Sequence, residues 1–235
     1  MKGRLYARTR FQICGDRAML VEYGEGVDPS VNEKVRAMAL LISRRKPAGV
    51  ETVIPAYRCL AVGYDPLRVA PDVLQANLLA LEGDLEEGQI EPARTVDIPV
   101  RYGGEDGPDL AFVAAHNHLT PDEVIRIHCQ APYHIYAVGF APGFCYLGGL
   151  DPRLHTPRLA TPRTRVPAGS VGIAESQTGV YPSESPGGWQ LIGRTPLTLF
   201  DPFKTDPFLY QPGDRIRFVP VSPEGLAQIR EHQAS

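Results

Sequence analysis

Apolar and turn-forming positions predict an alternation of strands and helices over the first hundred residues. Two short apolar runs flank Gly15-Asp16, which is typical of a hairpin, and Asp28-Pro29 precedes an apolar face at helical spacing. The predicted elements are strands at 11–14 and 18–23, a helix at 29–46, strands at 50–54 and 58–64, a helix at 71–81 and a strand at 94–100. From the second strand onward, the order strand, helix, two strands, helix, strand favours a compact α+β unit of the ferredoxin-like type.

The second half of the chain is richer in turns. Residues 109–118 and 121–130 are predicted as two short helices, and Thr120 and Glu123 have the spacing of a capping box. From 139 to 200 the chain holds ten glycines, eight prolines and no lysine. Short apolar runs at 170–174, 189–192, 197–200 and 215–221 therefore predict a β-barrel or sandwich. We expect the acidic segment 83–92 to link a domain at 1–90 to a second at 91–235.

Composition narrows the function classes. The chain has 235 residues, 43% of them apolar, so it can bury a core, and its net charge of −3 disfavours nucleic-acid binding. The four cysteines do not have metal-ligand spacing, and we find no secretory signal or long apolar run. We therefore expect reduced thiols, a cytoplasmic location, no membrane contact and no metal. Cys145 is interpreted as a small buried apolar residue rather than a nucleophile.

Familiar catalytic motifs are absent from the sequence. It contains no GxxxxGK[ST] phosphate loop, no GxGxxG after a strand, no HExxH and no GxSxG. His116, His118 and His128 fall at predicted helix ends, where imidazoles commonly play a structural part. Between His155 and His232 there is no histidine, so the β-rich half lacks an obvious base and no catalytic residue can be named.

The same half nevertheless has the composition of a binding site. Its glycine-containing runs VPAGS, QTG and SPGGW allow backbone N–H groups to approach a ligand, and arginines can hold an anion. The uncharged stretch GFAPGFCYLGG at 139–149 supplies aromatic side chains for an apolar wall. The alternative stays open on these residues alone: the glycines serve turns, the arginines are solvated and Trp189 belongs to a core.

The run GFAPGFCYLGGLDPRL, followed by TPRTRVPAGSVGIAESQTGVYPSESPGGWQLIGRTPL, closely resembles the allophanate hydrolase subunit 1 family. GDRAMLVEYG, PAYRCLAVGYDP, RYGGEDGPDL and PGDRIRFVPV extend the resemblance over nearly the whole chain. That family includes the B subunit of bacterial ATP-dependent 5-oxoprolinase and an inhibitor of a sporulation histidine kinase. The resemblance implies an α+β protein in which an N-terminal α+β domain precedes a C-terminal cyclophilin-like β-barrel.

The resemblance also implies partners and a reaction. Family members act with a homologous second subunit, similar to allophanate hydrolase subunit 2 or to the C subunit of 5-oxoprolinase, and a third subunit completes the 5-oxoprolinase. That complex opens the small molecule 5-oxoproline to L-glutamate with hydrolysis of ATP, so we expect a chain that is inactive alone. Without a phosphate loop, ATP must be held in another way or by a partner. The alternatives are a kinase inhibitor and a carboxyltransferase-like subunit acting on a urea-derived substrate; strict allophanate hydrolysis is least favoured.

On this basis we expect a substrate site in the β-rich half. Its expected members are Phe144, Arg163, Pro167, Gly169, Ser170, Gln177, Thr178, Gly187, Gly188, Trp189 and Arg194. Phe144 and Trp189 are expected as walls, whereas Arg163 and Arg194 are expected to contact substrate. One position departs from the family, which commonly has glycine where this chain has Glu175. A carboxylate there would disfavour an anionic ligand if it faced the site.

Overall fold

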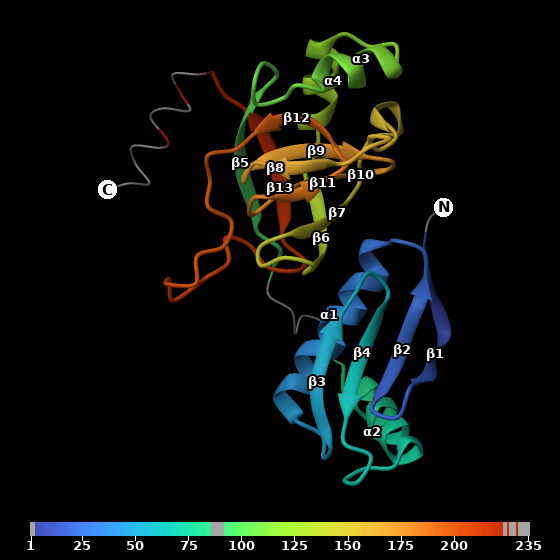
Figure 1. The fold of residues 1–235 in the computed structure, drawn as a ribbon. Coiled ribbons are helices and arrows are strands. Elements are labelled where there is room, and N and C mark those ends of the chain that lie inside the picture. The colour runs from blue at the N-terminus through green and yellow to red at the C-terminus, as the bar shows by residue number, and fades with distance from the viewer. Residues whose placement is uncertain (1–2, 86–91, 223–224, 226–228, 230–235) are drawn as a thin grey trace. The chain divides into compact units, whose positions relative to one another are not determined.

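The computed structural model describes residues 3–85, 92–222, 225 and 229. The chain divides into two compact units, Met1–Pro92 and Ala93–Ser235, and each is described by itself (Figure 1). Of the expected linker at 83–92, residues 86–91 lie outside the described residues. No helix in the described part of the chain is both long and apolar enough to span a membrane.

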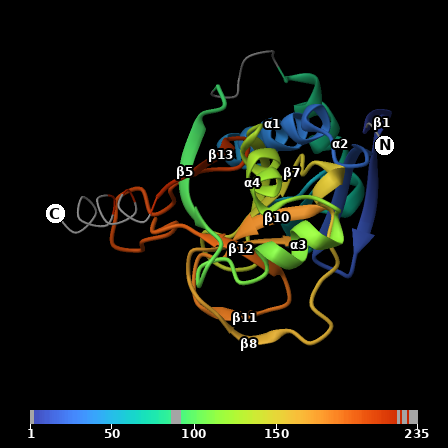
Figure 2. The ribbon, with the colours of Figure 1, turned by 90° about the horizontal axis from the view of Figure 1, so that it is seen from above.

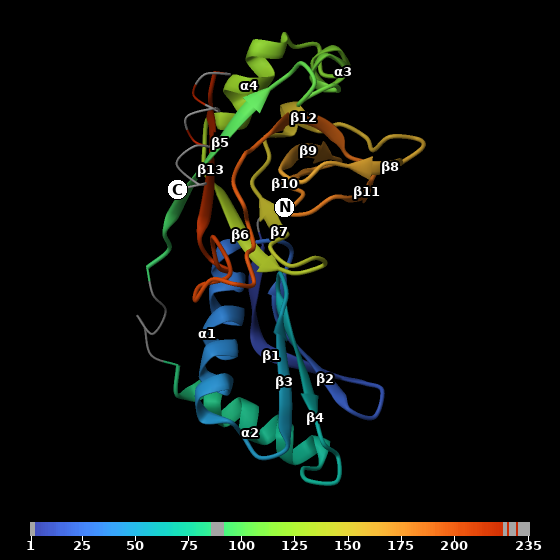
Figure 3. The same ribbon diagram turned by 60° about the vertical axis from the view of Figure 1, so that its left-hand side comes forward.

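The first unit is a four-stranded antiparallel sheet with two helices. Its elements are β1 (Arg4–Cys14), β2 (Ala18–Glu25), α1 (Pro29–Arg45), β3 (Val50–Pro55), β4 (Cys59–Tyr64) and α2 (Pro71–Gly83). The strand order is β1-β2-β4-β3, and both helices cover the same face of the sheet (Figures 1 and 3). α1 begins as predicted, because the Asp28 side chain accepts a hydrogen bond from the Ser30 backbone N–H at 2.9 Å. Its apolar stripe, including Val31, Val35 and Met38, is fully buried.

The ferredoxin-like assignment of this unit is not confirmed. The strand expected to complete it, at 94–100, is β5 (Thr95–Tyr102), and β5 pairs with strands of the second unit. Its inward side chains, Ile98 and Val100, are fully buried in the second core. Local patterning identified the strand but not its partner, because its parallel neighbour lies more than a hundred residues further along the chain.

The second unit is a nearly closed barrel with few helices, so the whole chain is an α+β protein. Its first elements are β5, α3 (Leu110–His116), α4 (Pro121–Cys129), β6 (Tyr133–Val138), β7 (Cys145–Gly148) and the 3₁₀ turn η1 (Pro152–Leu154). They are followed by β8 (Arg163–Val166), β9 (Ser170–Ala174), β10 (Gln177–Val180), β11 (Ser185–Gly187), β12 (Gln190–Arg194) and β13 (Arg215–Pro220). The sheet order is β10-β9-β12-β5-β13-β6-β7, and β10 lies against β7 to close the circle.

A two-stranded ribbon and a pair of helices are added to the barrel. β8 and β11 pair as a separate antiparallel ribbon at one side of the barrel (Figures 2 and 3). Helices α3 and α4 lie together at one end, and the predicted capping box of Thr120 and Glu123 is present at the start of α4.

The predicted strand at 197–200 is wrong, because only an isolated bridge from Phe200 to Phe208 forms there. Pro196 and Pro202 flank that segment, and proline supplies no N–H for a ladder.

Candidate functional site

A cavity of about 240 Å³ opens in the second unit where the ribbon meets the barrel. Its lining comes from the β6–β7 loop, β7, the segment before β8, β10 and the turn around β11. The lining residues are Phe140, Phe144, Tyr146, Arg158, Gln177, Tyr181, Pro186, Gly187, Gly188 and Trp189. Five of the eleven expected site residues therefore meet at one place, although they span 46 positions of sequence from Phe144 to Trp189.

Aromatic rings form the apolar wall of this cavity. Phe144 is central: its ring centroid lies 5.7 Å from that of Phe140, 5.2 Å from Tyr146 and 6.0 Å from Trp189. The interplanar angles of 71°, 78° and 80° are edge-to-face geometry, which the ring quadrupoles favour. Phe144 is only 7% exposed, so its ring is held between its neighbours rather than free in solvent.

The stretch GFAPGFCYLGG forms the β6–β7 hairpin loop and the strand after it. Gly139 N–H donates to the Phe144 carbonyl at 3.0 Å, and Phe144 N–H donates to the Ala141 carbonyl at 2.9 Å. The tight loop requires positive φ at Gly143 (84°) and also at Phe140 (71°), where a side chain is strained. Phe140 is 82% exposed at the cavity edge. Backbone strain of this kind gathers at functional sites, which favours a binding role for the loop.

A pair of glycines makes room for the indole ring of Trp189. Gly172 on β9 and Gly179 on β10 are direct partners in the antiparallel ladder. A Cβ atom on Gly172 would lie 3.1 Å from Trp189 Cβ, and one on Gly179 would lie 3.2 Å from the indole ring. The glycines of SVGIA and QTGV thus provide a flat floor for Trp189, which is a packing reason for their presence rather than a substrate contact.

Arg163, expected to contact substrate, instead positions the backbone that carries Trp189. Its Nη2 donates to Asp109 Oδ1 at 2.7 Å, and its Nη1 donates to the Trp189 carbonyl at 3.4 Å. The other carboxylate oxygen of Asp109 accepts from the Leu191 N–H at 2.6 Å. This ion pair therefore fixes both sides of the start of β12, and it lies outside the lining of the cavity.

The other expected site residues also lie outside the cavity lining. Ser170 and Thr178 are buried, at 2% and 1% exposure. Arg194 donates through Nε to the Ala168 carbonyl at 2.8 Å, which ties β12 to the turn before β9. The residues in this group are Arg163, Pro167, Gly169, Ser170, Thr178 and Arg194. They brace the strands around the cavity, and the glycine-rich run VPAGS serves a turn.

Sequence reasoning missed Arg158, Tyr181 and Pro186 as lining residues. Burial raises the pKa of Tyr181, while a hydrogen bond from the Trp189 backbone and the charges of Arg158 and Arg163 act against that rise. The positive charge of Arg158 at this end of the cavity favours an anion. Arg158 was visible as one of five arginines between residues 139 and 200, but only the fold shows which of the five reaches the cavity.

A polar chain runs through the barrel interior behind the cavity. Thr178 Oγ1 donates its one proton to the Gly172 carbonyl at 3.0 Å, so it must accept from His128 Nε2–H at 2.8 Å. The neutral imidazole then accepts at Nδ1 from the Tyr102 hydroxyl at 2.8 Å, which in turn accepts from the Cys129 thiol at 3.3 Å. Complete burial lowers the pKa of His128 to about 3 and keeps it neutral.

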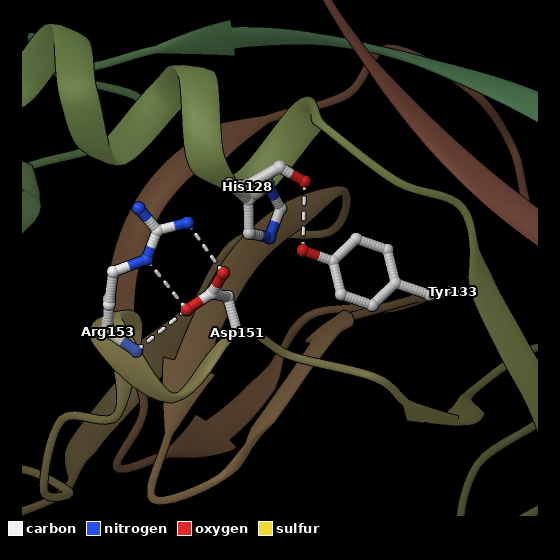
Figure 4. A network of polar contacts seen from close by, with 4 residues as sticks. All are labelled: His128, Tyr133, Asp151 and Arg153. Atoms are coloured by element: carbon white, nitrogen blue, oxygen red, sulfur yellow. Dashed lines mark hydrogen bonds and ion pairs between the residues drawn. The ribbon is translucent and has the colours of Figure 1, made fainter.

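Figure 4 shows the surroundings of His128 and the neighbouring charged pair. Tyr133 donates its hydroxyl to the His128 carbonyl at 2.9 Å, which satisfies the end of α4. Arg153 binds Asp151 through Nε at 3.0 Å and Nη2 at 2.7 Å, and its backbone N–H donates to the same carboxylate. These bonds lower the pKa of Asp151 to about 2. Asp151 and Arg153 therefore stabilise η1 and do not line the cavity.

We expect Cys145 to be inert. It is fully buried at the start of β7, and burial raises the pKa of its thiol to about 12, so almost no thiolate exists near neutral pH. Iodoacetamide should modify Cys14, which is exposed, much faster than Cys145 in the folded protein. Peptide mass spectrometry after brief labelling measures this order. Faster labelling of Cys145 than of Cys14 would contradict the structure.

Replacing Glu175 by glycine should stabilise the protein by about 1 kcal/mol. Glu175 lies at the β9–β10 turn with φ 51°, a left-handed conformation that glycine adopts without steric cost. Its side chain is exposed and is not part of the cavity lining, so its charge does not oppose an anion there. Denaturant unfolding measures the change. Glu175→Ala is the control: it removes the charge but keeps Cβ, and an equal gain in that variant would disprove the backbone explanation.

Comparison with known proteins assigns the family. The model of the carboxyltransferase domain, subdomain C and D, matches residues 9–210. The chain belongs to this family. The match covers all of the cavity lining and most of both units, and it confirms the family resemblance seen in the sequence.

Several known proteins are similar to this chain over nearly their full length. The B subunit of the 5-oxoprolinase of Bacillus subtilis is 45% identical, covering 95% of this chain and 98% of that protein. The corresponding B subunit of Escherichia coli O157:H7 is 43% identical, covering 91% and 96%. A conserved uncharacterized protein of Pyrococcus horikoshii, of known crystal structure, is 44% identical with a TM-score of 0.55, covering 92% and 100%.

Proposed function

We propose that this chain is the B subunit of an ATP-dependent 5-oxoprolinase, which helps to open 5-oxoproline to L-glutamate. The observation that carries the proposal is the identity of 43–45% over more than nine-tenths of the chain to proteins named as the B subunit of 5-oxoprolinase. The cavity is compatible with such a substrate. It combines aromatic walls with a single arginine, Arg158, among its described lining residues.

The chemistry of the cavity suggests binding rather than complete catalysis. Opening a lactam requires water to attack the amide carbonyl, a base to accept a proton and an acid to protonate the leaving nitrogen. The described lining residues include no histidine, aspartate, glutamate or lysine. They do include the phenol of Tyr181, but burial raises its pKa further above neutral pH. We infer that partner subunits supply the missing groups and that the isolated chain is inactive.

ATP enters the proposal through the complex. The chain has no phosphate loop, and its cyclophilin-like barrel, as we assign it, presents one arginine in the described cavity rather than a nest of basic groups. We therefore assign ATP binding to the homologous second subunit or to the third subunit. A hydrolase component of this kind needs both partners for turnover.

Co-expression with the neighbouring genes tests the proposed function. The purified complex should release glutamate from 5-oxoproline only when ATP is present, and this chain alone should release none. A matched preparation without this chain controls for activity of the partners. The proposal fails if the intact complex, with all subunits present in stoichiometric amounts, releases no glutamate.

A further inference from the structure

Arg158 is held at the cavity by hydrogen bonds on both sides of its backbone. The preceding carbonyl, of Pro157, accepts from Gln190 Nε2 at 2.9 Å, and the N–H of Leu159 donates to the Gly188 carbonyl at 2.7 Å. Gln190 is only 2% exposed, so its amide is a fixed anchor. The short segment that carries Arg158 is thereby tied to the strand that follows Trp189.

The guanidinium of Arg158 differs from those of two neighbouring arginines, which form ion pairs. Arg163 is paired with Asp109 and Arg165 with Glu184, at 2.7 and 2.6 Å. Within the described part of the chain, no ion pair includes Arg158. A cation at the edge of an apolar cavity, on an anchored backbone, is well suited to an anionic group of a ligand.

The size and walls of the cavity limit the rest of the ligand. A cavity of about 240 Å³ has room for a small molecule. The rings of Phe144 and Trp189 stand nearly perpendicular to one another at 80° and offer apolar faces and edges to a small ring. Gln177 also lines the cavity, and an amide side chain can both donate and accept hydrogen bonds.

We propose that this cavity binds a small cyclic carboxylate, with the carboxylate on Arg158 and the ring against the aromatic wall that Phe144 and Trp189 form. The inference rests on the proposed function, for which the ligand is 5-oxoproline, a five-membered lactam with one carboxylate. It assigns substrate recognition to this chain and makes Arg158 the residue that selects for the acid.

The single tryptophan of the sequence gives a direct measurement, because Trp189 itself lines the cavity. The full chain is titrated with 5-oxoproline, with 2-pyrrolidinone as the ring without a carboxylate, and with acetate as the carboxylate without a ring. We expect a saturable change in Trp189 fluorescence with 5-oxoproline at the lowest concentration. Equal apparent affinities for 5-oxoproline and 2-pyrrolidinone would overturn the assignment of the carboxylate to Arg158.

Two arginine variants distinguish a direct contact of Arg158 with the carboxylate from a general effect of positive charge near the cavity. Arg158→Gln should weaken 5-oxoproline binding at least about tenfold, since a charge-assisted hydrogen bond is lost, while leaving 2-pyrrolidinone binding unchanged. Arg165→Gln is the matched control: the same charge is removed from nearby β8, from a side chain paired with Glu184 and outside the lining. Equal weakening in both variants would overturn the proposal.

The assembled complex distinguishes failure of this inference from failure of the proposed function. In an active complex, Arg158→Gln should raise KM for 5-oxoproline at least about tenfold with a smaller effect on kcat, because the contact is made on binding. An active complex with unchanged KM in this variant overturns the inference and leaves the function standing. A wild-type complex without activity rejects the function, whereas the Trp189 titration still decides whether the cavity binds cyclic acids.

Discussion

Replacing Phe144 by alanine is expected to reduce kcat/KM for 5-oxoproline in the assembled complex by roughly 100-fold. The ring of Phe144 contacts those of Phe140, Tyr146 and Trp189, so its removal opens the wall and releases the indole. The fluorescence maximum of Trp189 should move to longer wavelength as water reaches it. Activity and emission spectra measured on the same preparation test both effects.

The loss must be separated from general unfolding. Truncation of a buried phenylalanine costs about 3–5 kcal/mol of stability when the site cannot collapse, but Phe144 lines an existing cavity, so the cost should fall at the low end. Phe144→Leu keeps most of the volume and should retain more activity. Phe112→Ala removes a half-exposed ring that stacks on His116 in α3. That control should leave activity unchanged, and a loss equal to that of Phe144→Ala would contradict a specific wall.

Sequence patterning predicted local elements better than their assembly. The helix after Asp28, the helix after Thr120 and the strand at 170–174 have local causes: side-chain caps and apolar periodicity. The pairing of β5 with β13 has no local cause, because it depends on closing a barrel over more than a hundred residues. The ferredoxin-like prediction is not confirmed at that point, because it inferred the partner of the last strand from the order of the elements along the chain.

In the candidate site, too, some features could be predicted from local sequence and others depend on long-range contacts. The aromatic residues Phe144 and Trp189 were expected as walls because they lie beside glycine and proline runs within the stretch that carries the family resemblance. Gly172 and Gly179 illustrate the opposite case, since their purpose is visible only when β9 pairs with β10 beneath the indole. The role of Arg158 likewise depends on which arginines have carboxylate partners, and pairs such as Arg163 with Asp109 join residues 54 positions apart.

Acid should destabilise the folded protein through His128. Burial lowers the pKa of His128 to about 3 in the folded protein, against about 6.5 in the unfolded chain. At pH values between these two pKa values, the unfolded state binds one more proton than the folded state. The unfolded fraction of the protein therefore grows as the pH falls. Above about pH 6.5 His128 is neutral in both states and does not lower the free energy of unfolding. Below that pH, each pH unit lowers the free energy of unfolding by about 1.4 kcal/mol until the pKa of the folded state is reached.

Replacing His128 by glutamine should flatten the pH dependence of stability. Glutamine has no proton to gain in this range, so the free energy of unfolding of the variant should fall less steeply from about pH 7 to about pH 5, by the equivalent of about one proton. Denaturant unfolding at several pH values measures both slopes, and the other histidines contribute equally to each protein. Equal slopes would show that His128 titrates normally in the fold.

At neutral pH the same variant should be the less stable protein by about 1–3 kcal/mol. His128 accepts from Tyr102 and donates to Thr178, at 2.8 Å in each case, and an amide of different shape cannot reach both positions well. The two proteins should therefore approach one another in stability as the solution is acidified. Loss of packing alone would lower the stability of the variant by the same amount at every pH. Convergence of the two stabilities in acid would therefore show that His128 is kept neutral by burial.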